Sequence, residues 1–234
     1  MPELPEVETV RRGLAQAMEG RLIKSVKVRR YDLRFPVPAD FSDRLRGRRL
    51  MTLERRAKYL VCTFDDKTVL LAHLGMSGRM VIENRGHPIV PGQFVLEKGM
   101  HDAHEHIVFE IDNGTTIRFS DPRRFGMMLL TTTCEFSSHK LIRHLGPEPM
   151  EDTFTGPVLA ARLRGKKTPI KSALLDQRVV AGVGNIYACE ALYAARISPR
   201  RGAFTVQGER AARLASAVRK VLKRAIDAGG SSLR

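Results

Sequence analysis

Cysteine is scarce in this 234-residue chain, and its three cysteines, Cys62, Cys134 and Cys189, stand alone. Their odd number and the lack of a Cys-x-x-Cys pair argue against both a disulfide scaffold and a cysteine zinc site. Long apolar runs are missing as well. No stretch approaches the roughly 20 residues of a membrane span, and no signal peptide precedes the acidic start. We therefore expect a protein of the reduced cytoplasm with no membrane partner.

Acidic residues are the second shortage. The chain has 25 Asp and Glu against 40 Lys and Arg, which gives a formal net charge of +15. This excess predicts attraction to a polyanion, usually nucleic acid, with a basic surface that serves only solubility as the alternative. From residue 159 onward there are 16 basic and 4 acidic residues, and 16 minus 4 gives +12 of the total. The C-terminal third is therefore the expected phosphate-binding part.

Short apolar or alternating runs fill the first half of the chain, and turn signals separate them, which is typical of β-strands. Eight such strands indicate a sandwich or a barrel. Between the sixth and the seventh, Asp112-Asn113-Gly114 predicts a hairpin, because Asn-Gly supplies the positive φ angles that a two-residue turn needs. Residues 84–99 have no clear period and predict a long surface loop. The expected strands are residues 22–28, 50–54, 59–64, 69–74, 79–82, 107–111, 115–119 and 127–130.

Helical periodicity appears at both ends of the chain. The apolar residues of the N-terminal stretch predict a helix that ends near Gly13 or Gly20. Residues 146–149, Gly-Pro-Glu-Pro, indicate a linker, and the last helix after it is expected to end at Gly229 and Gly230. The helices expected after the linker are residues 158–164, 170–176, 185–195 and 207–228.

These patterns predict an α+β fold with two domains. Residues 1–134 are expected to form a β-sandwich with flanking helices, and residues 135–150 a linker. Residues 151–234 are expected to form a basic helical domain.

The first residues place a proline where it can become the N-terminus. Removal of Met1 would leave Pro2 with a secondary amine, and α-amino groups titrate at about 7.7 to 8.0, so part of it would be neutral near pH 7. Such an amine can attack a sugar or carbonyl carbon to form an iminium. Glu3 or Glu6, kept protonated by desolvation, would be the general acid. The alternative is that Pro5 simply begins an ordinary helix.

Two internal loops have residue types that suit nucleic acid. Arg123 and Phe125 lie in one loop, where Arg can bond an orphaned base and Phe can fill the void left by an extruded one. An exposed Arg beside a core Phe is an equally good interpretation. Residues 182–185, Gly-Val-Gly-Asn, form a glycine turn into a helix start, whose N–H groups favour an anion. A plain helix–helix turn is the alternative.

A histidine cluster raises the question of a metal site. His101, His104 and His106 lie close together in sequence. Their spacing matches none of the strong zinc templates, so we expect no metal here. No serine or cysteine nucleophile motif appears either.

The opening string PELPEVETVRRGL resembles the start of the bacterial formamidopyrimidine-DNA glycosylases, which excise oxidised purines such as 8-oxoguanine. The resemblance implies Pro2 as Schiff-base nucleophile and Glu3 as acid. Glu6 would position the opened sugar, and Lys58 would bind the phosphate beside the lesion and assist β-elimination. Further matches imply a void-filling triad of Met76, Arg123 and Phe125, and DNA contacts at His73, His104, Arg123, Lys167 and Asn185.

The resemblance extends to the C-terminal domain, where residues 176–192 are similar to the family's helix-two-turn-helix module. It also implies that DNA binds in the cleft between the two domains. Family members continue past the glycine-ended helix with a four-cysteine zinc hairpin. The family's structural Zn²⁺ site would therefore lie in a module absent from this sequence, and no cofactor is expected within it.

The implied function is base-excision repair by a monomeric enzyme acting on double-stranded DNA. It would remove oxidised purines, 8-oxoguanine and formamidopyrimidines, and nick abasic sites by β-elimination. The alternative is a catalytically weak or silent damaged-DNA-binding fragment, because the zinc module is missing. An architectural or ribosome-type nucleic-acid protein and a proline-based tautomerase are the other classes that these residues allow.

Overall fold

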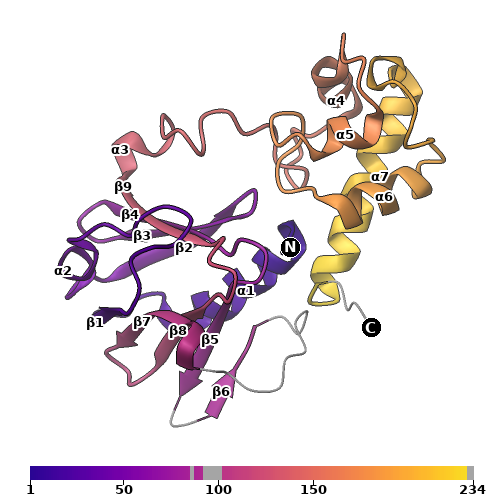
Figure 1. Cartoon of the computed structure of the whole chain (residues 1–234). Helices are drawn as coiled ribbons and strands as arrows, with labels where there is room; N and C mark the ends of the chain where they lie inside the picture. Colours follow the sequence, from indigo (N-terminus) through magenta and orange to yellow (C-terminus); the bar gives the residue numbers. More distant parts are fainter. Residues whose placement is uncertain (85–86, 92–101, 231–234) are drawn as a thin grey trace.

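The computed structural model describes residues 1–84, 87–91 and 102–230. Figure 1 shows a β-rich N-terminal part and a helical C-terminal part, connected by an extended segment, with helix α1 between them. The predicted α+β class, with an N-terminal β-sandwich and a helical C-terminal domain, is confirmed. Helix α3 (Thr133–Phe136) runs across the predicted boundary at residue 134. The boundaries at residues 134 and 150 stay predictions.

Helix α1 (Leu4–Met18) bridges the two parts. A proline lies in its first turn, and the Glu6 carboxylate accepts a hydrogen bond from the Glu3 backbone N–H at 2.8 Å, which satisfies a donor at the helix start. The helix ends two residues before Gly20, one of the two predicted ends. Leu4 packs in the core of the helical part. The next apolar residues pack instead in the sandwich core: Val7, Val10, Leu14 and Met18.

The described strands form two antiparallel sheets that share one core. One sheet has the order β1-β7-β8-β5-β6 and the other β2-β3-β4-β9. Phe119 from the first sheet and Leu60 from the second are fully buried in that core. The strands are β1 (Ile23–Val28), β2 (Leu50–Arg56), β3 (Tyr59–Phe64), β4 (Thr68–His73), β5 (Arg79–Asn84), β6 (His87–Ile89), β7 (Glu105–Ile111), β8 (Thr116–Ser120) and β9 (Met127–Thr132).

The eight predicted strands are all present, and one further strand lies where a loop was predicted. Strand β6 pairs with the end of β5, with Ile89 opposite Ile82. The loop prediction for residues 84–99 is therefore wrong at residues 87–89, because three residues are too few to show a period of two. Residues 85–86 and 92–99 of the predicted loop lie outside the described residues.

The hairpin between β7 and β8 is confirmed, but its turn is larger than predicted. Ile111 N–H donates to the Thr115 carbonyl at 2.9 Å, so three residues lie between these two. Gly114 has φ 84°, the left-handed conformation that glycine adopts without a Cβ penalty. Asp112, the first residue of the predicted signal, also belongs to the turn, which therefore has three residues and not the two that Asn-Gly favours.

Two short helices were not predicted, α2 (Phe41–Leu45) and α3. Helix α2 has only five residues, so its two apolar positions, Phe41 and Leu45, give no periodic signal. Both side chains are fully buried in the sandwich core. Tertiary burial therefore stabilises this turn of helix, because an isolated helix of this length is unstable in water.

The four helices predicted after the linker are confirmed. Helix α7 ends as expected: Gly229 (φ 79°) and Gly230 (φ 104°) are left-handed, and their N–H groups bond the carbonyls of Ile226 and Ala225. Within the described part of the chain, none of the helices combines the length and apolar character needed to cross a membrane. The helical elements are α4 (Gly156–Leu163), α5 (Ile170–Leu175), α6 (Asn185–Ala194) and α7 (Gly208–Asp227), with 3₁₀ turns at Asp102–His104 and Ala203–Thr205.

Candidate active site and nucleic-acid interface

The Glu3 carboxylate lies buried at the junction of the two domains, against the start of α6. Its Oε2 accepts the Gly184 N–H at 2.6 Å, and its Oε1 accepts the Ile186 N–H at 2.9 Å. Burial raises the pKa of Glu3, and the backbone N–H groups and the charge of Lys58 offset this only in part. Glu3 therefore holds its proton to a higher pH than an exposed glutamate, as a general acid requires.

The glycine turn before α6 is shaped around the N-terminal residues. A Cβ at Gly184 would lie 2.4 Å from Cδ of Glu3, so a side chain there would displace the carboxyl group. Gly182 has φ 81°, and its carbonyl accepts the Leu4 N–H at 3.0 Å. The N–H groups predicted to favour an anion at this helix start thus bond the protein's own Glu3 carboxyl group. Asn185 alone among the turn residues is exposed.

The Glu6 carboxylate is buried beside Glu3 and links helix α1 to the helical domain by hydrogen bonds. It accepts the Glu3 N–H through Oε2 at 2.8 Å and the Tyr187 hydroxyl through Oε1 at 2.5 Å. The role of Tyr187 was not predicted, because its partner lies 181 residues away in the sequence. The structure therefore assigns Glu6 an architectural role, and its predicted contact with the opened sugar stays a prediction.

Lys58 occupies the turn between β2 and β3 and is buried. Burial lowers the pKa of Lys58, while the negative charges of Glu3 and Glu6 raise it in part. The Lys58 ammonium group therefore interacts electrostatically with both carboxylates. Pro2 is also buried and directly precedes Glu3. The four residues predicted to be catalytic are therefore brought together.

His73, at the end of β4, lies at the edge of this cluster. Its Nδ1 accepts the Gly75 N–H at 2.9 Å, which leaves the ring proton on Nε2 of the neutral ring. The Tyr59 ring lies 5.1 Å away, centroid to centroid. Burial, with the charges of Lys58 and Arg34, lowers the pKa of His73 from 6.5 to about 4. A phosphate contact at neutral pH would thus be a hydrogen bond from Nε2 without a positive charge.

The predicted void-filling residues meet at one surface cavity of about 720 Å³, which Met1 and His73 also line. Met76 is 42% exposed and Phe125 is 44% exposed. The Arg123 guanidinium lies 4.8 Å from the centre of the Phe125 ring, a cation–π contact. Phe125 is therefore not a core residue, which removes the alternative interpretation of this loop.

Asp121 holds the loops of this triad together and is fully buried. Its Oδ1 accepts the Ser77 hydroxyl at 2.5 Å and its Oδ2 accepts the Gly126 N–H at 2.7 Å. Ser77 in turn accepts the Arg123 N–H at 3.2 Å. The loop backbones are thus fixed while the side chains that they carry stay exposed. The sequence did not predict this role of Asp121.

The remaining predicted DNA contacts lie around this centre. His104 is half-buried, and its carbonyl accepts the Asp121 N–H at 2.9 Å, so it lies beside the Arg123 loop. Asn185 is the first residue of α6, next to the glycine turn that binds the Glu3 carboxyl group. Lys167 is exposed in the turn after α4, on the helical domain, and the described contacts do not join it to the others. His101 lies outside the described residues.

Comparison with known proteins shows which class of protein this chain belongs to. The family model of the formamidopyrimidine-DNA glycosylase N-terminal domain matches residues 1–128, and that of the formamidopyrimidine-DNA glycosylase H2TH domain matches residues 145–234. Fold and site thus define a two-domain DNA glycosylase, and the predicted helix-two-turn-helix domain is confirmed. The chain belongs to the formamidopyrimidine-DNA glycosylase family.

Similar sequences and structures agree along the whole chain. It is 52% identical to formamidopyrimidine-DNA glycosylase of Ruegeria pomeroyi over 234 residues, all of this chain and 81% of that protein. The MutM (Fpg) protein of Thermus thermophilus has a TM-score of 0.82 at 37% identity over all of this chain and 79% of its own. Fpg of Lactococcus lactis in complex with DNA containing an abasic site has a TM-score of 0.84 at 31% identity, covering 99% of this chain and 81% of that one.

Removing the Tyr187 hydroxyl tests the junction. Tyr187→Phe loses a 2.5 Å hydrogen bond to the buried Glu6 carboxylate, and such a bond to a charged group contributes about 1.5 to 3 kcal/mol. We expect the free energy of unfolding, measured by urea denaturation, to fall by about 1 to 3 kcal/mol. Tyr193→Phe is the control, because Tyr193 lies on the same helix and is 88% exposed. Equal losses in both variants would contradict the junction role.

The pKa of His73 predicts a pH dependence of stability. His73 is neutral in the folded protein down to about pH 4, whereas in the unfolded chain it binds a proton below pH 6.5. Its contribution to stability is therefore present above pH 6.5 and lost as the pH falls toward 4. We expect the free energy of unfolding of the wild type to decrease relative to that of His73→Gln over this range. A constant difference in urea denaturation from pH 7 to pH 4 would contradict it.

Proposed function

We propose that this chain removes oxidised purines, such as 8-oxoguanine and formamidopyrimidines, from double-stranded DNA and then nicks the abasic site. The observation that carries the proposal is the buried Glu3 carboxyl, adjacent to Pro2 and close enough to Lys58 for their charges to interact. An acid beside an N-terminal amine is what Schiff-base chemistry needs. Relatives solved with DNA containing an abasic site or Fapy-dG support the substrate class.

In the proposed reaction, removal of Met1 frees the Pro2 nitrogen, whose lone pair attacks C1′ of the damaged nucleotide. The base leaves with the electrons of the glycosidic bond and takes up the proton that the Pro2 nitrogen loses. Glu3 gives its proton to the ring oxygen, the sugar opens, and an iminium joins Pro2 to C1′. The iminium acidifies C2′, whose proton loss expels the 3′ phosphate. Lys58 binds that phosphate, Glu6 positions the opened sugar, and no cofactor takes part.

The surface loops supply the proposed lesion recognition. Met76 and Phe125 would fill the space that an extruded base leaves, and Arg123 would hydrogen-bond the orphaned partner. Their exposure supports this, because the side chains are already outside the core. Lys167 and Asn185 would bind phosphates from the helical domain, with His73 and His104 on the sandwich side. We infer that the protein acts as a monomer in the cytoplasm.

The nucleophile is tested by trapping the iminium. With an 8-oxoguanine duplex and borohydride, the wild type should form a covalent adduct through Pro2, and Pro2→Gly should greatly weaken or abolish it. Pro5→Ala is the matched control, because Pro5 lies in the first turn of α1 and cannot become the N-terminus. An unchanged adduct in Pro2→Gly would remove Pro2 from the mechanism. Binding of the duplex without any adduct would favour the silent damaged-DNA binder.

Salt dependence separates the two kinds of DNA contact. Lys167→Ala should weaken binding to damaged and undamaged duplex equally and lower the slope of log K against log salt by about one unit. Arg123→Ala should slow adduct formation on 8-oxoguanine duplex and barely change nonspecific affinity, because its proposed partner is a base. Equal loss of affinity on both duplexes for Arg123→Ala would instead indicate a phosphate contact.

A further inference from the structure

The turn that carries Lys58 has an unfavourable backbone. Strands β2 and β3 pair up to Arg56 and Tyr59, so Ala57 and Lys58 form the whole turn. Ala57 has φ 54°, a left-handed conformation that is unfavourable for a residue with a Cβ. Its side chain is also buried. A turn of this kind persists only where its surroundings determine it.

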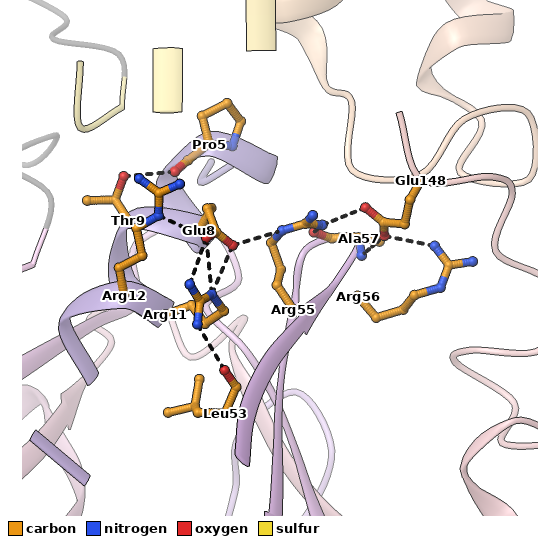
Figure 2. Close-up of polar contacts among 10 residues, drawn as sticks. All are labelled: Pro5, Glu8, Thr9, Arg11, Arg12, Leu53, Arg55, Arg56, Ala57 and Glu148. Atoms are coloured by element: carbon orange, nitrogen blue, oxygen red, sulfur yellow. Dashed lines mark hydrogen bonds and ion pairs between the residues drawn. The ribbon is translucent and has the colours of Figure 1, made fainter. Parts of the chain in front are cut away.

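Glu148 supplies those surroundings, and Figure 2 shows its carboxylate facing the turn and two arginines. It accepts the Ala57 N–H at 2.5 Å, Arg55 Nη1 at 2.8 Å and Arg56 Nη1 at 2.8 Å. Glu148 is 5% exposed. A buried carboxylate with three charge-assisted or backbone donors holds a fixed geometry, because each lost bond would leave charge unpaired.

Arg55 completes the clamp from the other side of the turn. Its Nη1 donates to the Ala57 carbonyl at 3.0 Å, and this carbonyl belongs to the peptide group that leads into Lys58. Its Nε lies 3.4 Å from Glu8 of helix α1 (Figure 2). Both peptide groups of Ala57 are therefore fixed by one buried ion pair, which is itself attached to α1.

The segment around Glu148 also contacts the turn that cradles Glu3. The Gly146 N–H donates to the Gln177 carbonyl at 2.8 Å, and the Ala181 N–H donates to the Pro147 carbonyl at 3.0 Å. Ala181 directly precedes the glycine turn, residues 182–184, against which Leu4 and Glu3 lie. Glu148 thus stands between the hairpin that presents Lys58 and the turn that holds the acid.

We propose that Glu148 is a positioning residue that fixes the position of Lys58 relative to Glu3. It does so by holding the strained β2–β3 turn against the segment that contacts the glycine turn around Glu3. The inference rests on the proposed function for its effect on activity. Glu148 touches no substrate in this account and acts through Lys58. A structural salt bridge between domains is the competing explanation, and it predicts loss of stability without a specific link to Lys58.

Two substitutions of Glu148 separate the effect of side-chain length from the effect of charge. Glu148→Asp keeps the negative charge but is one methylene shorter, so its carboxylate withdraws from the fixed Ala57 N–H, whereas the long arginine side chains can follow it. Glu148→Gln keeps the length and removes the charge. Arg219→Ala is the matched control, because Arg219 bonds the carbonyls of Pro149, Glu151 and Phe154 on the same segment without touching the hairpin.

The first measurement is the rate of borohydride-trapped adduct formation on abasic-site DNA. We expect both Glu148 variants to lower it by about 10- to 100-fold, and Arg219→Ala to leave it within about twofold at a temperature where all are folded. Combined with Lys58→Ala, each Glu148 substitution should add little further loss, since it acts through the same lysine. Additive losses in the double variants would overturn the proposal.

The second measurement needs no activity and follows Lys58 in the DNA-free protein. Because burial holds the pKa of Lys58 down, a loosened hairpin should raise it toward the ordinary value, as read from the ¹³Cε shift during titration. We expect this rise, together with faster exchange of the Ala57 amide, in Glu148→Asp and not in Arg219→Ala. No change in either signal would overturn the inference. A wild type that forms no adduct would overturn the proposed function alone.

Discussion

The Glu3 carboxylate bound at the start of α6 is the contact on which the rest of the structure depends. It joins the N-terminus to the helical domain through the N–H groups of Gly184 and Ile186. A helix start favours a negative charge, whereas burial opposes it. Burial dominates, so the pKa of Glu3 is raised. The contact that orders the two domains therefore also produces an acid beside Pro2.

The buried charges of this region support one another in two adjoining groups. Lys58 lies with the Glu3 and Glu6 carboxylates, while Arg55 lies between Glu8 and Glu148. The β2–β3 hairpin belongs to both groups. Removing one member of a buried pair is costly because it leaves a desolvated charge behind. Each group thus resists rearrangement of the other. The position of Lys58 therefore depends on Arg55 and Glu148 as well as on Glu3 and Glu6.

Local patterns predicted the strands and helices because the apolar residues that each element buries recur with a period of two or 3.6 within a short stretch of sequence. Elements of three to five residues, such as β6 and α2, show no period and were missed. The motif residues of the site were found through resemblance, as Lys58 and Arg123 illustrate. Their supports were not found, because Tyr187 and Glu148 bond partners 181 and about 90 residues away. Such pairs exist only once the chain has folded.

The two halves of the site differ in the way they are ordered. The acid and Lys58 are buried and fixed by side-chain bonds, whereas Arg123 and Phe125 project into solvent from a loop fixed at its base by Asp121. Ordering a backbone costs about 1 to 2 kcal/mol per residue. The hydrogen bonds of Asp121 already order the loop backbone in the folded protein. In the proposed function, entry of the triad into a duplex would then require only side-chain ordering and DNA deformation. A loop with a fixed backbone and exposed side chains suits that proposed role, because little backbone entropy is left to lose on binding.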